Sequence, residues 1–311
     1  MPVLQPAGVP TFYFIGVTTG HSSIMQVFPR WANILGLDAV IRGIDLPLHA
    51  PPEQYREAAG FIKNDPLSLG ALVTTHKLDL FNACQDMFDY IDPYAEKLRE
   101  VSSLSKREGK FSAHAKDPVS SGLALEAFVP PRFWSGRGGE ALLLGAGGSS
   151  LAMSLYFSEH GKTGNAPARI TIANRSRPRL ESAKAVLRNT GEIEFRFVHS
   201  PSPQDNDRLV AALPPYSLVV NATGLGKDAP GSPTTDEVSY PQHSLVWEIN
   251  YRGDLLFKRQ AEAQAAERNL YIEDGWNYFI HGWTQVIAEV FHIGIDADML
   301  AALNAAAKQK A

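Results

Sequence analysis

The stretch ALLLGAGGSSLAMSLYF, residues 141–157, joins an apolar run to a helix-like segment through a glycine-rich turn. The run Ala141–Leu144 is typical of a buried strand. Glycines suit a backbone that turns sharply and lies against a pyrophosphate, and the free N–H groups that open a helix bind such an anion. Ser150 stands where the usual pattern has its third glycine. Because a strand precedes the turn and a helix follows it, we predict a dinucleotide-binding turn rather than a tight turn without a ligand.

The next strand-like run, ARITIANRSRPR at 168–179, predicts which dinucleotide is bound. An enzyme that uses NAD usually places an acidic residue at the end of this strand, where it binds the ribose hydroxyls. Here polar and basic residues follow instead: Asn174, Arg175, Ser176, Arg177 and Arg179. A carboxylate would repel a 2′-phosphate, whereas guanidinium groups bind it. We therefore predict NADP as the cofactor; the alternative is a solvated basic loop.

Strand-like and helix-like runs alternate on both sides of residue 130. In the first half we expect strands at 12–18, 39–46 and 69–75, helices at 25–36, 52–63 and 77–88, and a hairpin at 101–117 that turns at Arg107–Gly109. In the second half we expect strands at 141–147, 168–176, 193–200, 217–224 and 243–250, with helical stretches between them. We expect residues 274–308 to be helical throughout, in two amphipathic segments. Such alternation predicts an α/β fold with parallel sheets covered by helices.

Residues 129–140, VPPRFWSGRGGE, lie between the two series and concentrate proline, glycine and charge, as interdomain connections do. The chain has 311 residues, 44% of them hydrophobic, so two domains are more natural than one. No cluster of cysteine, histidine or carboxylate has metal-ligand spacing, and we infer no metal.

The charge and hydropathy of the chain exclude several partners. Its net charge of -4 and its pI near 6.1 give no basic field, so we expect no nucleic acid. No apolar run approaches the roughly 18 residues that a membrane span needs. The start MPVLQPAGVPTFYFIG lacks the features of a signal peptide. We therefore expect a cytoplasmic protein that does not bind a membrane.

An ordered set of motifs resembles the shikimate dehydrogenases, and the likeness covers nearly the whole chain. The motifs are GVTTGHSS (16–23), VTTHK (73–77), KDPVSSG (116–122), GAGGSS (145–150), NRS (174–176), NATG (221–224), VWEINYRGDLL (246–256) and EDGWNYFIHGW (273–283). The resemblance implies an α/β substrate-binding catalytic domain over 1–130 and an NADP-binding Rossmann domain, a doubly wound parallel sheet, over 137–272. It also implies that C-terminal helices at 273–311 return to the first domain.

The resemblance further implies that Lys77 and Asp117 transfer the proton in the cleft between the domains. A lysine in a closed cleft can have its pKa moved towards neutrality, and a neighbouring carboxylate can orient it. The alternatives are a solvated surface lysine at Lys77 and an N-cap, at Asp117, of a helix that begins at Pro118.

The remaining candidate residues follow from the same motifs. Substrate-binding candidates are Ser22, Thr74, Ser102, His76, His114 and Tyr251. The two histidines are adjacent to the proton-transfer segments, and with Lys116 they would give the cleft a positive character suited to an anionic substrate; the alternative is that they are packing residues. Cofactor-binding candidates are Gly145, Ala146, Gly147, Gly148, Ser149, Ser150, Asn174, Arg175, Ser176, Arg179, Asn221, Ala222, Thr223, Gly224 and Gly275.

The sequence departs from the family pattern where that family binds shikimate. Non-matching residues stand at the polar positions of the pattern: Ile24, Leu72, Ser102-Ser103, Ala115, Lys116 and Gly282. A polar site that loses several hydrogen-bonding groups loses orders of magnitude of affinity for its original ligand.

We therefore expect an NADP-dependent oxidoreductase, monomeric or homodimeric, acting on a small polyhydroxylated or carboxylated alcohol or ketone other than shikimate. The alternatives are a genuine shikimate or quinate dehydrogenase and a catalytically inactive nucleotide-binding regulator.

Overall fold

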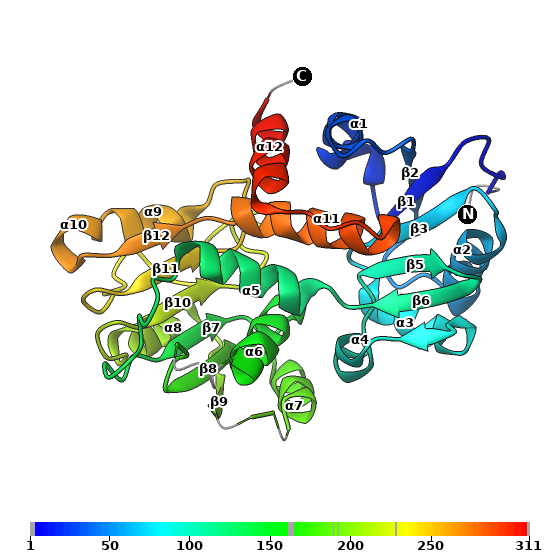
Figure 1. Ribbon diagram of the computed structural model, residues 1–311. Helices are drawn as coiled ribbons and strands as arrows, with labels where there is room; N and C mark the ends of the chain where they lie inside the picture. The colour runs from blue at the N-terminus through cyan, green and yellow to red at the C-terminus, as the bar shows by residue number, and fades with distance from the viewer. Residues whose placement is uncertain (1–3, 161–164, 189, 192, 228, 310–311) are drawn as a thin grey trace. The chain divides into compact units, whose positions relative to one another are not determined.

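The computed structural model describes residues 4–160, 165–188, 190–191, 193–227 and 229–309. These residues form two compact units (Figure 1). Unit 1 contains the described residues up to Lys116 and from Gly282 onwards, and unit 2 contains those from Asp117 to His281. We predicted functional domain limits at 130, 137 and 272 instead, and those limits stay a prediction.

Unit 1 is built on a sheet in the strand order β2-β1-β3-β5-β6-β4. The strands are β1 (Thr11–Gly16), β2 (Val40–Asp45), β3 (Ser68–Val73), β4 (Tyr90–Ile91), β5 (Ser103–Arg107) and β6 (Lys110–His114). The predicted parallel pairing is confirmed for β1, β2 and β3, and the predicted hairpin for β5 and β6. The hairpin needs no crossover and pairs antiparallel with β3, so this sheet is mixed.

The helices of the first 116 residues are α1 (Ile24–Leu35), α2 (Pro52–Asn64), α3 (Lys77–Cys84) and α4 (Pro93–Leu98), with 3-10 turns η1 (Thr19–His21) and η2 (Gln85–Met87). The chain ends in α11 (Trp276–Phe291) and α12 (Ala297–Lys308). As predicted, the C-terminal helices return to the first part of the chain. The Phe14 and Trp283 rings lie 5.0 Å apart, and the Trp31 indole N–H donates to the Leu303 carbonyl at 2.8 Å.

Unit 2 contains a fully parallel sheet in the order β12-β11-β10-β7-β8-β9. The strands are β7 (Ala141–Leu144), β8 (Arg169–Asn174), β9 (Glu194–His199), β10 (Leu218–Asn221), β11 (Leu245–Glu248) and β12 (Tyr271–Glu273). This order is that of the doubly wound dinucleotide-binding fold, which confirms the predicted fold class. Such folds bind ligands where the order reverses, here between β7 and β10.

The helices of unit 2 are α5 (Asp117–Phe128), α6 (Gly148–His160), α7 (Arg177–Val186), α8 (Pro203–Ala211), α9 (Leu256–Glu262) and α10 (Ala265–Arg268). Helix α5 packs against α6 (Figure 1). It begins at Asp117, one residue earlier than the predicted start at Pro118. No helix in the described part of the chain is long and apolar enough to span a membrane.

Candidate functional site

A cavity of about 580 Å³ lies at the carboxyl ends of β7, β8 and β10 in unit 2. Ten of the predicted cofactor residues line it: Gly145, Ala146, Gly147, Asn174, Arg175, Ser176, Arg179, Ala222, Thr223 and Gly224. Three separate loops of the sequence therefore meet at one cavity, at the place where a doubly wound sheet binds its ligand.

The glycines of the first loop are needed for two different reasons. Gly145 has φ +114°, and a Cβ there would lie 2.5 Å from the Ala222 carbonyl oxygen. A Cβ on Gly147 would meet nothing within 4 Å. Gly145 thus allows the close approach of two loops, whereas Gly147 leaves open space at the cavity where a phosphate can approach the backbone.

Three other predicted cofactor residues are the first three residues of α6: Gly148, Ser149 and Ser150. They are not among the described residues that line the cavity. Ser150 is fully buried, and its hydroxyl donates to the Gly145 carbonyl at 2.7 Å. Ser149 accepts a hydrogen bond from the Tyr278 hydroxyl at 3.4 Å. The serine in place of the third glycine therefore supports the turn from within.

The basic loop after β8 presents two guanidinium groups to the cavity. Arg175 and Arg179 are exposed, and within the described residues no carboxylate pairs with either of them. The Asn174 Oδ1 atom accepts from the Ser176 N–H at 2.7 Å, and Ser176 caps α7. These bonds fix the strand-to-helix turn, so two uncompensated positive charges remain available for an anion.

The sequence did not predict the part of the lining that follows β9. It includes Ser200, Ser202 and Asn206. The Ser200 hydroxyl donates to Asn206 Oδ1 at 2.6 Å, and Asn206 Nδ2 donates to the Pro233 carbonyl at 2.7 Å. Ser202 forms a capping box with Asp205 at the start of α8. This serine-to-aspartate spacing after a predicted strand is the signal that could have located the segment.

The remaining predicted residues of unit 2 are not among the described residues that line the cavity. Asn221 is fully buried, and its Oδ1 atom accepts from the Thr223 N–H and hydroxyl. A Cβ on Gly275 would lie 2.0 Å from the Ile249 carbonyl oxygen, so this glycine is required by a close backbone approach. The Tyr251 ring packs on the Phe279 ring at 4.5 Å.

Lys77 is the first residue of α3 in unit 1 and is half-buried. The Lys77 carbonyl accepts from the Val101 N–H at 3.1 Å. Ser102 follows Val101, and its hydroxyl accepts from the Lys116 N–H at 2.7 Å. Residues 101 and 102 therefore tie the segment that carries Lys77 to the segment that ends at Lys116. Asp117 is the next residue along the chain.

The turn that leads into Lys77 is strained. Thr75 has φ +62°, a left-handed conformation that β-branched residues rarely adopt. Such a conformation costs on the order of 1–3 kcal/mol and persists only where its surroundings enforce it. On the strand side, the Thr74 N–H donates to the Ile15 carbonyl at 3.0 Å. The chain is therefore held in a specific path immediately before Lys77.

His76 holds this turn from the interior. Its ring is 1% exposed, and its Nδ1 atom lies 3.1 Å from the Tyr55 hydroxyl. That hydroxyl accepts from the Ala50 N–H and donates to Asp79 at 3.4 Å. Burial first, and then the charge of Asp79, raise the pKa of Tyr55, so the hydroxyl keeps its proton. The burial of His76 favours a packing role over contact with a substrate.

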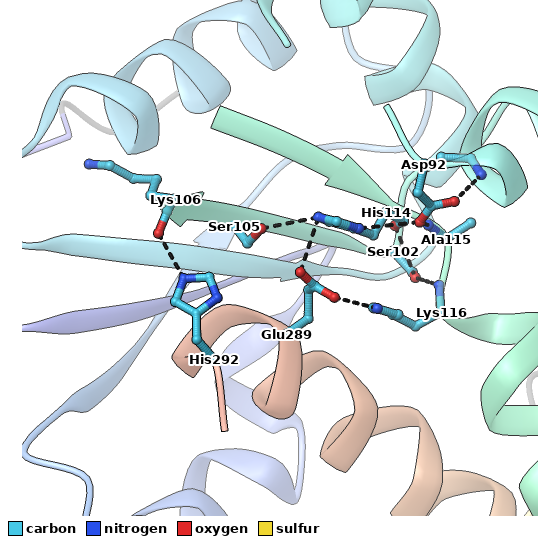
Figure 2. Close-up of polar contacts among 10 residues, drawn as sticks. Asp92, Ser102, Ser105, Lys106, His114, Ala115, Lys116, Glu289 and His292 are labelled. Atoms are coloured by element: carbon cyan, nitrogen blue, oxygen red, sulfur yellow. Dashed lines mark hydrogen bonds and ion pairs between the residues drawn. The ribbon is translucent and has the colours of Figure 1, made fainter. Parts of the chain in front are cut away.

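His114 belongs to a network of charged groups in unit 1 (Figure 2). Its Nε2 atom lies 3.2 Å from Glu289 of α11 and 3.1 Å from the Ser105 hydroxyl, and its Nδ1 atom lies 3.4 Å from Asp92. The second oxygen of Glu289 pairs with the Lys116 ammonium. Burial alone would raise the pKa of Glu289, but the hydrogen bond from Lys116 and the nearby positive charges lower it overall.

The Glu289 carboxylate was not predicted, and it changes the expected electrostatics. We expected His114 and Lys116 to give a positive surface suited to an anionic substrate. Glu289 offsets the charge of Lys116, and both ring nitrogens of His114 face carboxylates. That expectation is therefore wrong for these two residues.

Ser22 ends the turn η1, where its N–H donates to the Thr19 carbonyl at 2.9 Å. Asp45 anchors the same turn, because it accepts from the Thr19 N–H and hydroxyl at 2.8 and 2.6 Å. Within the described residues, no group of three or more histidine, cysteine or carboxylate side chains is placed to hold a metal ion.

Comparison with known proteins relates this geometry to a family. No protein-family model matches the chain. It is 32% identical over 268 residues to the shikimate dehydrogenase (NADP(+)) of Rhodopseudomonas palustris strain HaA2, covering 86% of the chain and 85% of that protein. It is 30% identical over 240 residues to the protein of the same name from Symbiobacterium thermophilum, covering 76% and 75%. The chain belongs to the shikimate dehydrogenase family.

Solved structures of two differently named proteins share the fold of this chain. Shikimate dehydrogenase from Aquifex aeolicus superposes with a TM-score of 0.74 at 18% identity, over 98% of this chain and 100% of that one. The ligand-free 5-ketofructose reductase of Gluconobacter sp. strain CHM43 superposes with a TM-score of 0.71, also at 18% identity, over 96% and 98%. One fold thus carries proteins with differently named substrates.

Three departures from the shikimate dehydrogenase pattern are core positions in this structure. Ile24 and Ala115 are 0% exposed, and Leu72 is 8% exposed. The Ala115 N–H donates to the Asp92 carboxylate at 2.9 Å. A Cβ on Gly282 would meet nothing within 4 Å, so this departure leaves open space rather than a packed side chain.

Proposed function

We propose that this protein transfers a hydride between NADP(H) and a small polyhydroxylated or carboxylated alcohol or ketone other than shikimate. The observation that carries the proposal is the cavity of unit 2, which Arg175 and Arg179 line without a carboxylate partner among the described residues. The names of the two relatives, which include NADP(+), support the choice of nucleotide.

The residues of the cavity fit NADP. The backbone at Gly147 and the start of α6 would hold the pyrophosphate, because the free N–H groups and the helix dipole favour an anion. Arg175, Ser176 and Arg179 would hold the 2′-phosphate. NADP supplies or accepts the hydride when it is bound. The protein must then provide orientation, exclude water and move one proton.

We assign the transfer of this proton to Lys77. Oxidation of an alcohol by hydride loss requires removal of the hydroxyl proton, and reduction of a ketone requires its return. The rigid turn before Lys77 supports this role, because a proton donor must be held within hydrogen-bond distance of its target. We assign Asp117 to orient the Lys77 ammonium.

Several hydrogen-bonding groups of the family pattern are missing from this chain. Ile24 and Ala115 offer no polar side chain, and Glu289 offsets the charge of Lys116. A site with these changes lacks several of the groups by which the family pattern binds shikimate. A genuine shikimate or quinate dehydrogenase is the second candidate, and the names of the relatives favour it.

A substrate screen separates these candidates. Purified protein with NADP(H) is offered cyclic polyols, hydroxy acids, ketoses, shikimate and quinate, and the absorbance of the reduced nicotinamide is followed. Turnover of another compound with negligible turnover of shikimate supports the proposal. Robust oxidation of shikimate or quinate at ordinary concentrations establishes the second candidate. Tight NADP binding without turnover of any compound indicates a nucleotide-binding regulator.

A further inference from the structure

Glu248 is a buried carboxylate in unit 2 that neither the cavity lining nor the proposed chemistry uses. It is the last residue of β11 and is 0% exposed. Three N–H groups donate to it: the Asn250 N–H at 2.9 Å and side-chain amide at 2.7 Å reach one oxygen, and the Asn221 amide at 2.7 Å reaches the other. A carboxylate that accepts several N–H bonds acts as a fixed anchor for the groups that donate them.

Both asparagines connect this carboxylate to the loop that lines the cavity. The Asn250 amide also donates to the carbonyls of Thr223 and Leu225, at 3.3 and 3.2 Å. The Asn221 amide donates to the Leu225 carbonyl at 3.3 Å, while its oxygen accepts from the Thr223 N–H at 3.0 Å. Thr223 and Leu225 line the cavity. Glu248 therefore fixes two amides, and these two amides fix the loop.

We infer that the ionised Glu248 carboxylate is a positioning residue for the 223–225 loop, and that its protonation weakens the binding of NADP. This inference rests on the proposed function, because it takes NADP as the ligand of the cavity. The added proton would turn one acceptor oxygen into a donor that faces an N–H group. At least one asparagine amide must then rotate or release its partner, and the loop carbonyls lose their donor.

The surroundings of Glu248 place its titration in an accessible range. Burial raises the pKa of Glu248 to about 7, although the N–H bonds from Asn250 and Asn221 lower it, and the charge of Asp274 raises it further. Asp274 itself pairs with Lys258 at 3.1 Å. Burial also raises the pKa of Tyr240, with smaller contributions from the charges of Asp207 and Glu248, so Tyr240 stays neutral. Glu248 thus changes charge near neutral pH.

The expected size of the effect follows from the population of the ionised form. If the protonated form binds NADP about tenfold more weakly than the ionised form, the apparent affinity is the average of the two affinities, weighted by the populations of the two forms. With a pKa of about 7, the Kd would be about fivefold higher at pH 6 than at pH 8.

The test compares NADP binding by the wild type and by Glu248→Gln, measured by calorimetry at pH 6, 7 and 8. The amide is isosteric but must present an N–H₂ group to one of the donors, so it imitates the protonated carboxylate at every pH. We expect the ratio of the variant Kd to the wild-type Kd to be about nine at pH 8 and about two at pH 6. The ratio removes the titration of the 2′-phosphate of the ligand, which is common to both proteins.

Two further variants keep the test decisive. Glu248→Asp retains a carboxylate and should retain a pH-dependent Kd even if its affinity is lower. Glu267 lies on α10, and its side chain is 74% exposed. Glu267→Gln should therefore leave the Kd for NADP and its pH dependence unchanged. A ratio that stays constant from pH 6 to pH 8, or a Glu248→Asp variant without pH dependence, overturns the role of Glu248 while the proposed cofactor stands. Absence of NADP binding in all four proteins overturns the proposed function and this inference together.

Discussion

The two units hold their candidate residues in different ways. In unit 2 the predicted residues of three loops meet at one cavity because the carboxyl ends of parallel strands lie together. In unit 1 the residues adjacent to the predicted proton-transfer pair are held by side chains from distant segments. His76 is held by Tyr55 of α2, and His114 by Asp92 and by Glu289 of α11.

This difference teaches which parts of a site a motif can specify. A nucleotide turn is made largely of backbone, so the glycines and the strand before them locate it. A substrate site is made of side chains, and one unexpected carboxylate such as Glu289 changes the net charge of the group of side chains around it. The comparison can be tested by changing one group in each unit and asking whether the effect stays within the property assigned to that unit.

The largest effect is expected at Lys77. If Lys77 transfers the proton, Lys77→Ala should lower kcat by roughly 10²–10⁴-fold. The Kd for NADP should barely change, because the cavity lining belongs entirely to unit 2. Stopped-flow kinetics with the substrate that the screen identifies, together with calorimetry for NADP, measure the two quantities.

Three further variants test the assignment of Lys77. Lys77→Met keeps the length of the side chain but cannot carry a proton, and it should be as slow as the alanine variant. Asp117→Asn should also be slow, and combining it with Lys77→Ala should add little, because residues that act as a unit are not additive. Near-normal turnover by Lys77→Met would falsify the assignment and return Lys77 to the solvated surface.

The next largest effect is expected at Arg179 in unit 2. Arg179→Ala removes a charge-assisted partner of the 2′-phosphate and should weaken NADP binding by about tenfold, while the binding of NAD changes little. Arg177→Ala is the matched control, since Arg177 is exposed on the same helix but is not among the described lining residues. If the alanine at 179 weakens both nucleotides equally, the phosphate assignment is wrong.

A smaller effect, on stability, is expected at Glu289. Glu289→Gln removes the negative charge that faces Lys116 and His114, and should destabilise the protein by about 2 kcal/mol at pH 7, less than a fully buried pair would lose. Because its folded pKa is lowered, Glu289 stabilises the protein above its unfolded pKa of 4.5, and this contribution is lost as the pH falls through the folded value. Urea unfolding should show a larger difference from wild type at pH 7 than at pH 3.5.

The exposed Glu57 of α2 provides the control, since Glu57→Gln should leave unfolding unchanged at both pH values. An equal loss of stability by Glu289→Gln at pH 7 and pH 3.5 would mean that packing, rather than charge, holds the network together.

The smallest effect is expected at Tyr55. Tyr55→Phe keeps the buried ring but leaves His76 and the Ala50 N–H without their partner, which should cost about 1–2 kcal/mol of stability. Because the turn before Lys77 loosens, kcat should also fall while the Kd for NADP stays constant. Tyr13→Phe removes another buried tyrosine hydroxyl, from β1, and should leave kcat unchanged. A loss of stability without any change in kcat would limit Tyr55 to packing.

Much of the fold was predictable from the sequence, and the exceptions are short. Strands β4 and β12 contain two and three residues, and α4 contains six. Elements of this length carry too few residues to show a period of 2 or 3.6. The start of α5 was misplaced by one residue, because Asp117 suits both an N-cap and the first turn of a helix.

The sequence alone determined the order of the long strands and helices, the glycine-rich turn and the basic loop that follows β8. These features depend on residues close together in the chain, whose backbone preferences and spacing can be read directly. Only the tertiary structure decided that Glu289 meets His114 and Lys116, that Tyr55 holds His76, and that Glu248 lies buried beneath the nucleotide loop. These contacts join residues from separate elements, and their energies depend on burial and geometry that no local pattern records.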